Sequence, residues 1–81
     1  MIKVQMVVPG MKREFDVEYN ENAQIRDIIT DTLDVLSQYL GTSYINREQW
    51  ILVLSREGIA LDPDRVLKSY QVENGDKLIL M

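Results

Sequence analysis

The hydrophobic period of this chain changes near residue 20, and this change constrains the fold more than any other feature of the sequence. In Ile2–Val8 and Phe15–Tyr19 apolar residues recur at every second position, which is typical of strands with one buried face. In Ala23–Leu40 the spacing is helical, and an arc of about 160° on a helical wheel, expected to face the core, holds Ile25, Ile28, Ile29, Thr32, Leu33, Val35, Leu36, Tyr39 and Leu40. The sequence therefore predicts a strand hairpin followed by an amphipathic helix with one core face.

Turn and cap residues set the expected limits of these elements. Pro9–Lys12 supplies the turn chemistry between the first two strands. Asn22 is suited to cap the helix by accepting from an unpaired N–H group, and Gly41 suits the position just past its end. We therefore expect the helix to run over about Ala23–Leu40 and to be followed by a polar loop through Asn46.

The rest of the chain predicts three more strands and a helical turn. Trp50–Leu54 is apolar on both faces, which indicates a central strand. Ile59–Leu61 predicts a short strand, and Asp62–Pro63 predicts the cap and first position of a helical turn that runs to about Lys68. Asn74–Gly75 tolerates positive φ in a turn and leads into the last strand. This order of elements predicts one mixed sheet with a single helix across one face.

The absence of cysteine and histidine removes most of the chemistry that an active site uses. With no Cys and no His, the chain has no disulfide, no thiol nucleophile, no Cys or His zinc site and no Ser-His pair. We therefore expect a protein that is not an enzyme, with no catalytic residue, no metal site and no cofactor. A small hydrolase is the catalytic alternative, and saturable turnover that survives repurification would reveal it.

Composition and charge predict one small soluble domain over residues 1–81. The chain is 46% hydrophobic and 27% charged, with no repeat and no low-complexity linker. Its net charge of -4 and sequence pI near 4.6 disfavour nucleic acid and anionic membrane surfaces as partners. The longest apolar runs are too short to insert across a bilayer, and no signal peptide is visible. The expected location is therefore cytoplasmic.

The C-terminal third of the chain resembles the ubiquitin-like proteins. Within Asp64–Val72, Leu67 and Tyr70 form a Leu-x-x-Tyr-x-hydrophobic signature at a short helical turn, and Asn74–Leu80 resembles the last strand. The resemblance covers essentially the whole chain in the order and spacing of elements. It implies an α+β, ubiquitin-like β-grasp fold: a mixed sheet of four to five strands, one amphipathic helix across one face, and a short helical turn before the last strand. It also implies that the hydroxyl of Tyr70 bonds nearby backbone.

Within that superfamily the chain is most similar to the YukD/EsaB family. The size fits, Trp50 opens the third strand, Asp64–Leu67 leads to Tyr70–Val72, and Gly75–Asp76 precedes a Leu-rich end. This resemblance implies a cytosolic accessory or regulator of the type VII (ESX/WXG100) secretion system of Gram-positive bacteria.

The end of the sequence separates this interpretation from its main alternatives. The chain ends at Met81 without a Gly-Gly tail, so we expect that it is not conjugated to other molecules. A sulfur carrier or covalent modifier with the same fold is one alternative, and a generic ubiquitin-like adaptor outside secretion is another. A stable C-terminal adduct or thiocarboxylate in cells would favour the first of these.

Strand alternation predicts which residues face outward, and the resemblance implies that the first, last and third strands are neighbours, so that these residues form one apolar patch on the outer face of the sheet. The residues assigned to the inner face are Ile2, Val4, Met6, Phe15, Val17, Trp50, Leu52, Leu54, Leu78 and Leu80. The residues left on the outer face, which we predict to bind a protein partner, are Val7, Ile51, Val53, Ile79 and Met81. The family resemblance implies Ile51 as the position of partner contact, and Glu14, Asp16 and Glu18 would form a charged rim. Type VII secretion components are the expected partners, and a homodimer through the same face is the competing use.

Other notable residues have structural explanations that we favour. Asp27, Asp31 and Asp34 lie on the polar side of the helix, where solvated charges are expected. Asp62 lacks the further oxygen ligands of a calcium loop, so capping explains it better. Trp50 faces the predicted helix and is expected in the core rather than in a recognition site.

Overall fold

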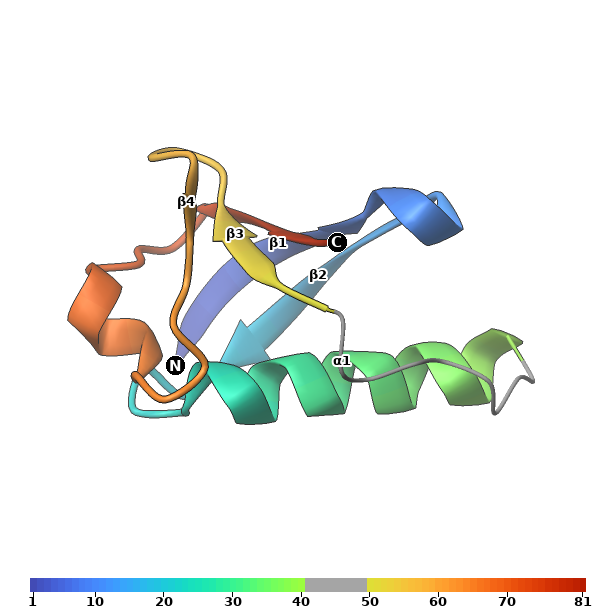
Figure 1. Cartoon of the computed structure of the whole chain (residues 1–81), viewed down its shortest axis with the longest axis horizontal. Coiled ribbons are helices and arrows are strands. Elements are labelled where there is room, and N and C mark those ends of the chain that lie inside the picture. The colour runs from blue at the N-terminus through green and yellow to red at the C-terminus, as the bar shows by residue number, and fades with distance from the viewer. Residues whose placement is uncertain (41–49) are drawn as a thin grey trace.

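The computed structural model describes residues 1–40 and 50–81. Within this part of the chain, one α-helix lies across one face of a five-stranded sheet (Figure 1). The strands are β1 (Ile2–Val8), β2 (Arg13–Tyr19), β3 (Leu52–Leu54), β4 (Ile59–Ala60) and β5 (Lys77–Leu80). The helices are α1 (Ile25–Leu40) and the short 3-10 helices η1 (Pro9–Met11) and η2 (Leu67–Tyr70). Gly41 and the loop through Asn46, for which the sequence also makes predictions, lie outside the described residues.

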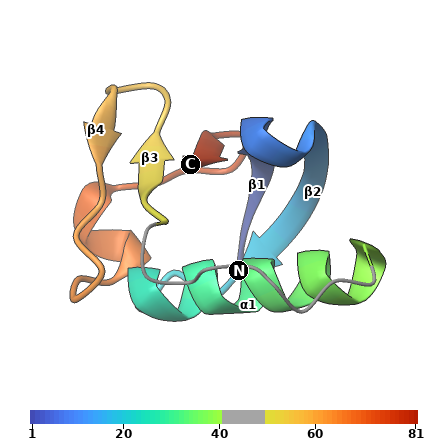
Figure 2. The same cartoon turned by 45° about the vertical axis from the view of Figure 1, so that its right-hand side comes forward.

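The sheet has the strand order β2-β1-β5-β3-β4. β1 and β5 are parallel, and every other neighbouring pair is antiparallel, so the sheet is mixed as predicted. Figure 2 shows β2 and β4 at opposite edges. The first, last and third strands are therefore neighbours, as the expected outer-face patch requires.

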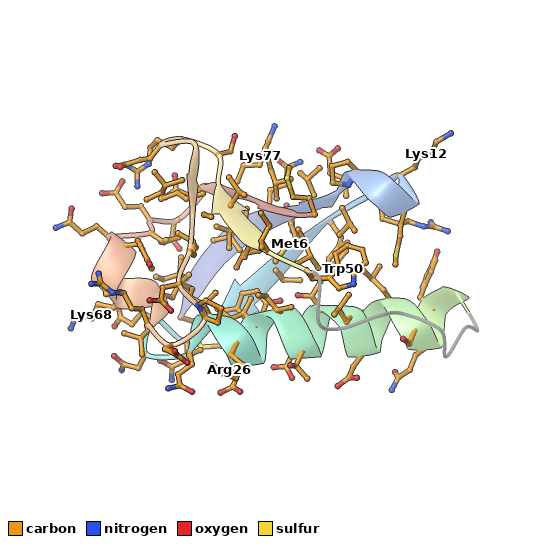
Figure 3. All side chains as sticks on the ribbon, viewed as in Figure 1. Met6, Lys12, Arg26, Trp50, Lys68 and Lys77 are labelled. Carbon is orange, nitrogen blue, oxygen red and sulfur yellow. The ribbon has the colours of Figure 1, made fainter. Side chains whose placement is uncertain are left out.

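The core lies between the inner face of the sheet and α1. The buried residues of α1 recur at helical spacing and include Ile25, Ile28, Leu33 and Leu36, each at most 2% exposed. They pack in one cluster with the inward residues of the strands, among them Met6, which lies between sheet and helix in Figure 3. Phe15 and Val17 also face this side but are only partly buried, because their strand is at the edge of the sheet.

The helix begins at Ile25, two residues later than predicted, so Asn22 lies before the N-cap position. The N–H groups of Ile25 and Arg26 donate instead to the carbonyl oxygens of Arg65 and Pro63, at 2.9 and 3.1 Å. Backbone carbonyls of a segment distant in sequence therefore satisfy the first turn of α1, and a side-chain cap is not needed.

The predicted helical turn also begins later, at Leu67 instead of Pro63. Asp62 forms a local turn. Its Oδ1 accepts a hydrogen bond from the N–H of Asp64 at 2.9 Å, and its carbonyl oxygen accepts one from the N–H of Arg65 at 3.1 Å. Val66 is extended, with φ -96° and ψ 158°, because it pairs with Gln24 just before α1. The contact with α1 thus delays the helical turn to Leu67.

The remaining limits differ by one or two residues. β3 is shorter than predicted, with Trp50 and Ile51 preceding it, and β4 ends at Ala60. The predicted turn before the last strand is confirmed, since Gly75 has φ +89°, a value that L side chains rarely adopt.

Candidate protein-interaction surface

The outer face of the sheet brings together the residues predicted to bind a partner. Val7 of β1 lies opposite Ile79 of β5, and Ile79 lies opposite Val53 of β3. The three side chains form one row over three adjacent strands, and each is partly buried. Figure 1 shows α1 on one face of the sheet. The row alternates with buried residues that pack toward α1, so it lies on the opposite face.

Ile51 and Met81 extend this row along the outer face. The N–H of Ile51 donates to the carbonyl of Met81 at 2.8 Å, and the N–H of Met81 donates to the carbonyl of Ile51 at 3.0 Å. Each residue lies two positions from a member of the row, which places it on the same face. They are the most exposed members, at 47% and 52%. We call the five residues Val7, Ile51, Val53, Ile79 and Met81 the outer patch.

Charged residues border the outer patch along β2. Glu14 lies opposite Val7 and accepts a hydrogen bond from the side-chain amide of Gln5. Asp16 and Glu18 follow on the same face, and all three carboxylates are exposed. The predicted acidic rim is therefore in place beside the apolar row.

Two lysines on the same face were left out of the predicted charged rim. Lys77 precedes Ile79 by two residues on β5 and points away from the helix (Figure 3). Lys3 lies opposite Glu18 on the hairpin. The same alternation that predicted the outer patch could have found both. They make the polar end of this face mixed in charge, with carboxylates along one side of the outer patch and ammonium groups at its end.

A bidentate ion pair holds the strands that carry the outer patch. The Nε and Nη2 atoms of Arg56, just after β3, lie 3.1 and 3.2 Å from the two carboxylate oxygens of Asp76, just before β5. Asp76 also accepts from the N–H of Glu73 at 2.9 Å. The hydrogen bond from Arg56 is the largest cause that lowers the pKa of the Asp76 carboxyl below its ordinary value. The pair links the segment that follows β3 to the segment that precedes β5.

Trp50 and Tyr70 occupy the structural positions expected of them. Trp50 is partly buried, packs against the core and lies on the helix side of the sheet (Figure 3). The hydroxyl of Tyr70 accepts from the N–H of Asp62 at 2.8 Å, as the family resemblance implied. Asp27 and Asp31 are exposed, whereas Asp34 is partly buried. The described residues contain no group of three or more acidic side chains placed to hold a metal ion.

A second apolar region lies at the end of α1, and here the helical-wheel prediction is wrong. Val35 and Tyr39 were expected on the core face but are 55% and 71% exposed. Val35 lies at the margin of the apolar arc, and Tyr39 lies in the last described turns, where its ring contacts the guanidinium of Arg13 at 4.7 Å. Together with Phe15 and Leu36 they line a groove of about 330 Å³ between α1 and β2.

Comparison with known proteins assigns the chain to a family. The model of the family described as "WXG100 protein secretion system (Wss), protein YukD" matches residues 1–80. The chain belongs to the YukD family. It is therefore a ubiquitin-like protein of a family linked to WXG100 secretion, as its sequence predicted. A search of curated protein sequences gives no significant match.

Solved structures confirm the ubiquitin-like β-grasp fold. Ubiquitin from Caldiarchaeum subterraneum is 22% identical with a TM-score of 0.77, over 98% of this YukD-family chain and 89% of its own. The ubiquitin-like domain of Plasmodium falciparum Dsk2 is 22% identical with a TM-score of 0.76, over 98% and 93% of the two chains. A ubiquitin-like domain from Arabidopsis thaliana is 20% identical with a TM-score of 0.74, over 99% and 74%. In the part of the YukD-family chain that the structure describes, no helix is long and apolar enough to cross a membrane.

Proposed function

We propose that this protein is a non-catalytic interaction module that assists or regulates WXG100 secretion from the cytoplasm by non-covalent contact with a protein component of that system. The observation that carries the proposal is the outer patch, in which residues of three adjacent strands form one apolar surface. Contiguous exposed apolar residues mark interaction sites, whereas scattered ones are normal on a folded protein.

The surroundings of the outer patch fit a docking role. The fully buried centre of a protein interface is apolar and its rim is polar, which is the arrangement of Ile79 and its neighbours beside Glu14 and Asp16. Charges at a rim act mainly on the rate and orientation of encounter. The apolar residues would therefore supply the affinity, and the carboxylates and lysines would select the orientation of the partner.

Substitution of Ile51 by Asp tests this proposal. Ile51 is 47% exposed, so Ile51→Asp should leave the fold intact, while the new charge must be desolvated in any interface. We expect the variant to lose cross-links to secretion-system components in native cells, as read by mass spectrometry. The matched control is Ile59→Asp, the same change at a 39% exposed isoleucine outside the outer patch, which should keep the cross-links.

The outcomes separate the remaining uses of the surface. Unchanged cross-links in Ile51→Asp would place the partner site elsewhere. A wild-type dimer that dissociates on this substitution, seen by sedimentation, would show that the outer patch serves self-association. A covalent adduct in the intact mass of the protein from cells would contradict the non-covalent mode.

A further inference from the structure

The free edge of β2 is a second candidate contact site, distinct from the outer patch. Within the described residues, the backbone of this seven-residue strand pairs with β1 alone, and Figure 2 shows it at the border of the sheet. An edge strand of this length presents unpaired N–H and C=O groups to which another extended segment can add.

The hydrogen bonds of β1 show which groups of β2 face outward. The N–H of Gln5 donates a hydrogen bond to the carbonyl of Asp76, and the carbonyl of Lys3 accepts one from the N–H of Gly75. The backbone N–H and C=O groups of the odd-numbered residues of β1 therefore point toward β5. Its even-numbered residues face β2, where they lie opposite Arg13, Phe15, Val17 and Tyr19. The N–H and C=O groups of Glu14, Asp16 and Glu18 therefore point to the free edge.

The two faces beside this edge differ in chemistry. The carboxylates of Glu14, Asp16 and Glu18 project on the outer face, and within the described residues no salt bridge is formed by any of them. The inner face opens on the apolar groove that Phe15 shares with Val35 and Leu36. A segment paired to β2 would thus place alternate side chains against carboxylates and in an apolar groove.

We propose that β2 takes up an extended, antiparallel segment of a partner protein in which basic and apolar residues alternate. The basic residues lie directly opposite Glu14, Asp16 and Glu18, and the apolar residues between them enter the groove beside Phe15. Charge complementarity selects this occupant over a second copy of the chain. Antiparallel pairing of β2 with itself about Asp16 would oppose Asp16 to Asp16 and Glu14 to Glu18, and like charges directly opposite are destabilising.

A capped seven-residue peptide that alternates Lys with Val, as long as β2, tests the proposal on the full chain. We expect binding to slow amide hydrogen exchange at Glu14, Asp16 and Glu18, whose N–H groups become bonded. The amides of Phe15 and Val17 already bond β1 and should change little. Reversal of two charges in Asp16→Lys/Glu18→Lys should weaken binding about tenfold, and added salt should weaken it in the wild type.

Two matched pairs of controls decide the outcome. N-methylation of the peptide backbone at its Lys residues removes the N–H donors to β2 and should abolish binding. N-methylation at its Val residues should leave binding measurable. Both peptides are tested against the wild-type protein, so the comparison does not depend on whether a variant folds. Glu73→Lys, a reversal at an exposed carboxylate outside β2, should bind as the wild type does. Ile51→Asp should also bind the peptide as the wild type does, so the test of the β2 edge is independent of the test of the outer patch. Unchanged exchange at the three edge amides, or equal effects of the two methylation patterns, would overturn the proposal.

Discussion

The two faces of the same three strands differ in burial although both are rich in aliphatic residues. On the inner face, Met6, Leu52 and Leu78 have no exposed surface. On the outer face, Val53 and Ile79 are partly exposed and Ile51 is 47% exposed. Alternation along a strand thus places neighbouring residues in different environments, and in our proposal one set stabilises the fold while the other contacts a partner. Substitutions at adjacent positions should therefore have separable effects.

The largest expected effect is on the inner face. Leu78→Ala removes a fully buried side chain between β1 and β3, so the free energy of unfolding should fall by about 3 kcal/mol from lost apolar contact and the cavity left behind. Urea unfolding monitored by circular dichroism measures the change. A loss as small as that of a surface substitution would contradict the assignment of this face to the core.

Thr32, the one buried polar residue in the part of the chain that the structure describes, gives the next effect. Its hydroxyl donates to the carbonyl of Ile28 at 2.8 Å, and it accepts from the hydroxyl of Tyr19 on β2 at 2.8 Å. Thr32→Val leaves the Tyr19 hydroxyl without this partner and should lower the free energy of unfolding by about 1 kcal/mol. Tyr19→Phe is the matched comparison, and it should have the smaller effect because Thr32 keeps its bond to Ile28. A reversed order in urea unfolding would contradict this account.

The effect of acid on stability should distinguish the Arg56–Asp76 ion pair from an ordinary surface pair. The pKa of Asp76 is lowered by its hydrogen bond from Arg56, so the folded state binds fewer protons than the unfolded chain as the pH falls through the carboxylate range. The stabilisation is present above the unfolded pKa of about 4 and is lost as the pH falls through the lower folded value. The stability advantage of the wild type over Asp76→Asn should therefore shrink below about pH 4.

A second carboxylate on the same arginine is the control for that measurement. Glu57 lies 3.2 Å from Nη1 of Arg56 but is 51% exposed, whereas the side chain of Asp76 is 11% exposed. Glu57→Gln should show little pH-dependent difference from the wild type in urea unfolding, because exposed single pairs contribute little. Equal pH dependence in the two variants would show that the bidentate geometry of Asp76 gives no special stabilisation.

Local patterns predicted the parts of this molecule that depend on period and turn chemistry. Alternation assigned Val7, Val53 and Ile79 to the outer face, and the resemblance supplied the strand order that makes them neighbours. The start of α1 was not predictable in this way, because the carbonyls of Pro63 and Arg65 come from a segment about forty residues away in the chain. No local signal marks such a cap.

Local patterns alone could not predict the groove and the free edge, for a related reason. A helical wheel gives the direction of Val35 and Tyr39 but not the extent of the sheet opposite them. Their exposure follows from the position of β2 at the border of the sheet, which is a property of strand order. Likewise, the outward direction of the backbone groups of Asp16 follows from the pairing of β1 with β5 on its other side.

The smallest expected change in stability is at the outer patch. Ile51→Thr keeps the β-branch and adds no charge at a position that is 47% exposed, so the free energy of unfolding should change by about 0.5 kcal/mol or less. If the outer patch forms the apolar centre of an interface, the same substitution should weaken partner binding about fivefold, because it removes apolar surface that only the complex buries. Unfolding and affinity measured on one preparation give both values. A loss of stability comparable to that of Leu78→Ala, with affinity unchanged, would mean that the outer face is a second packed surface and that Ile51 serves the fold instead of a partner.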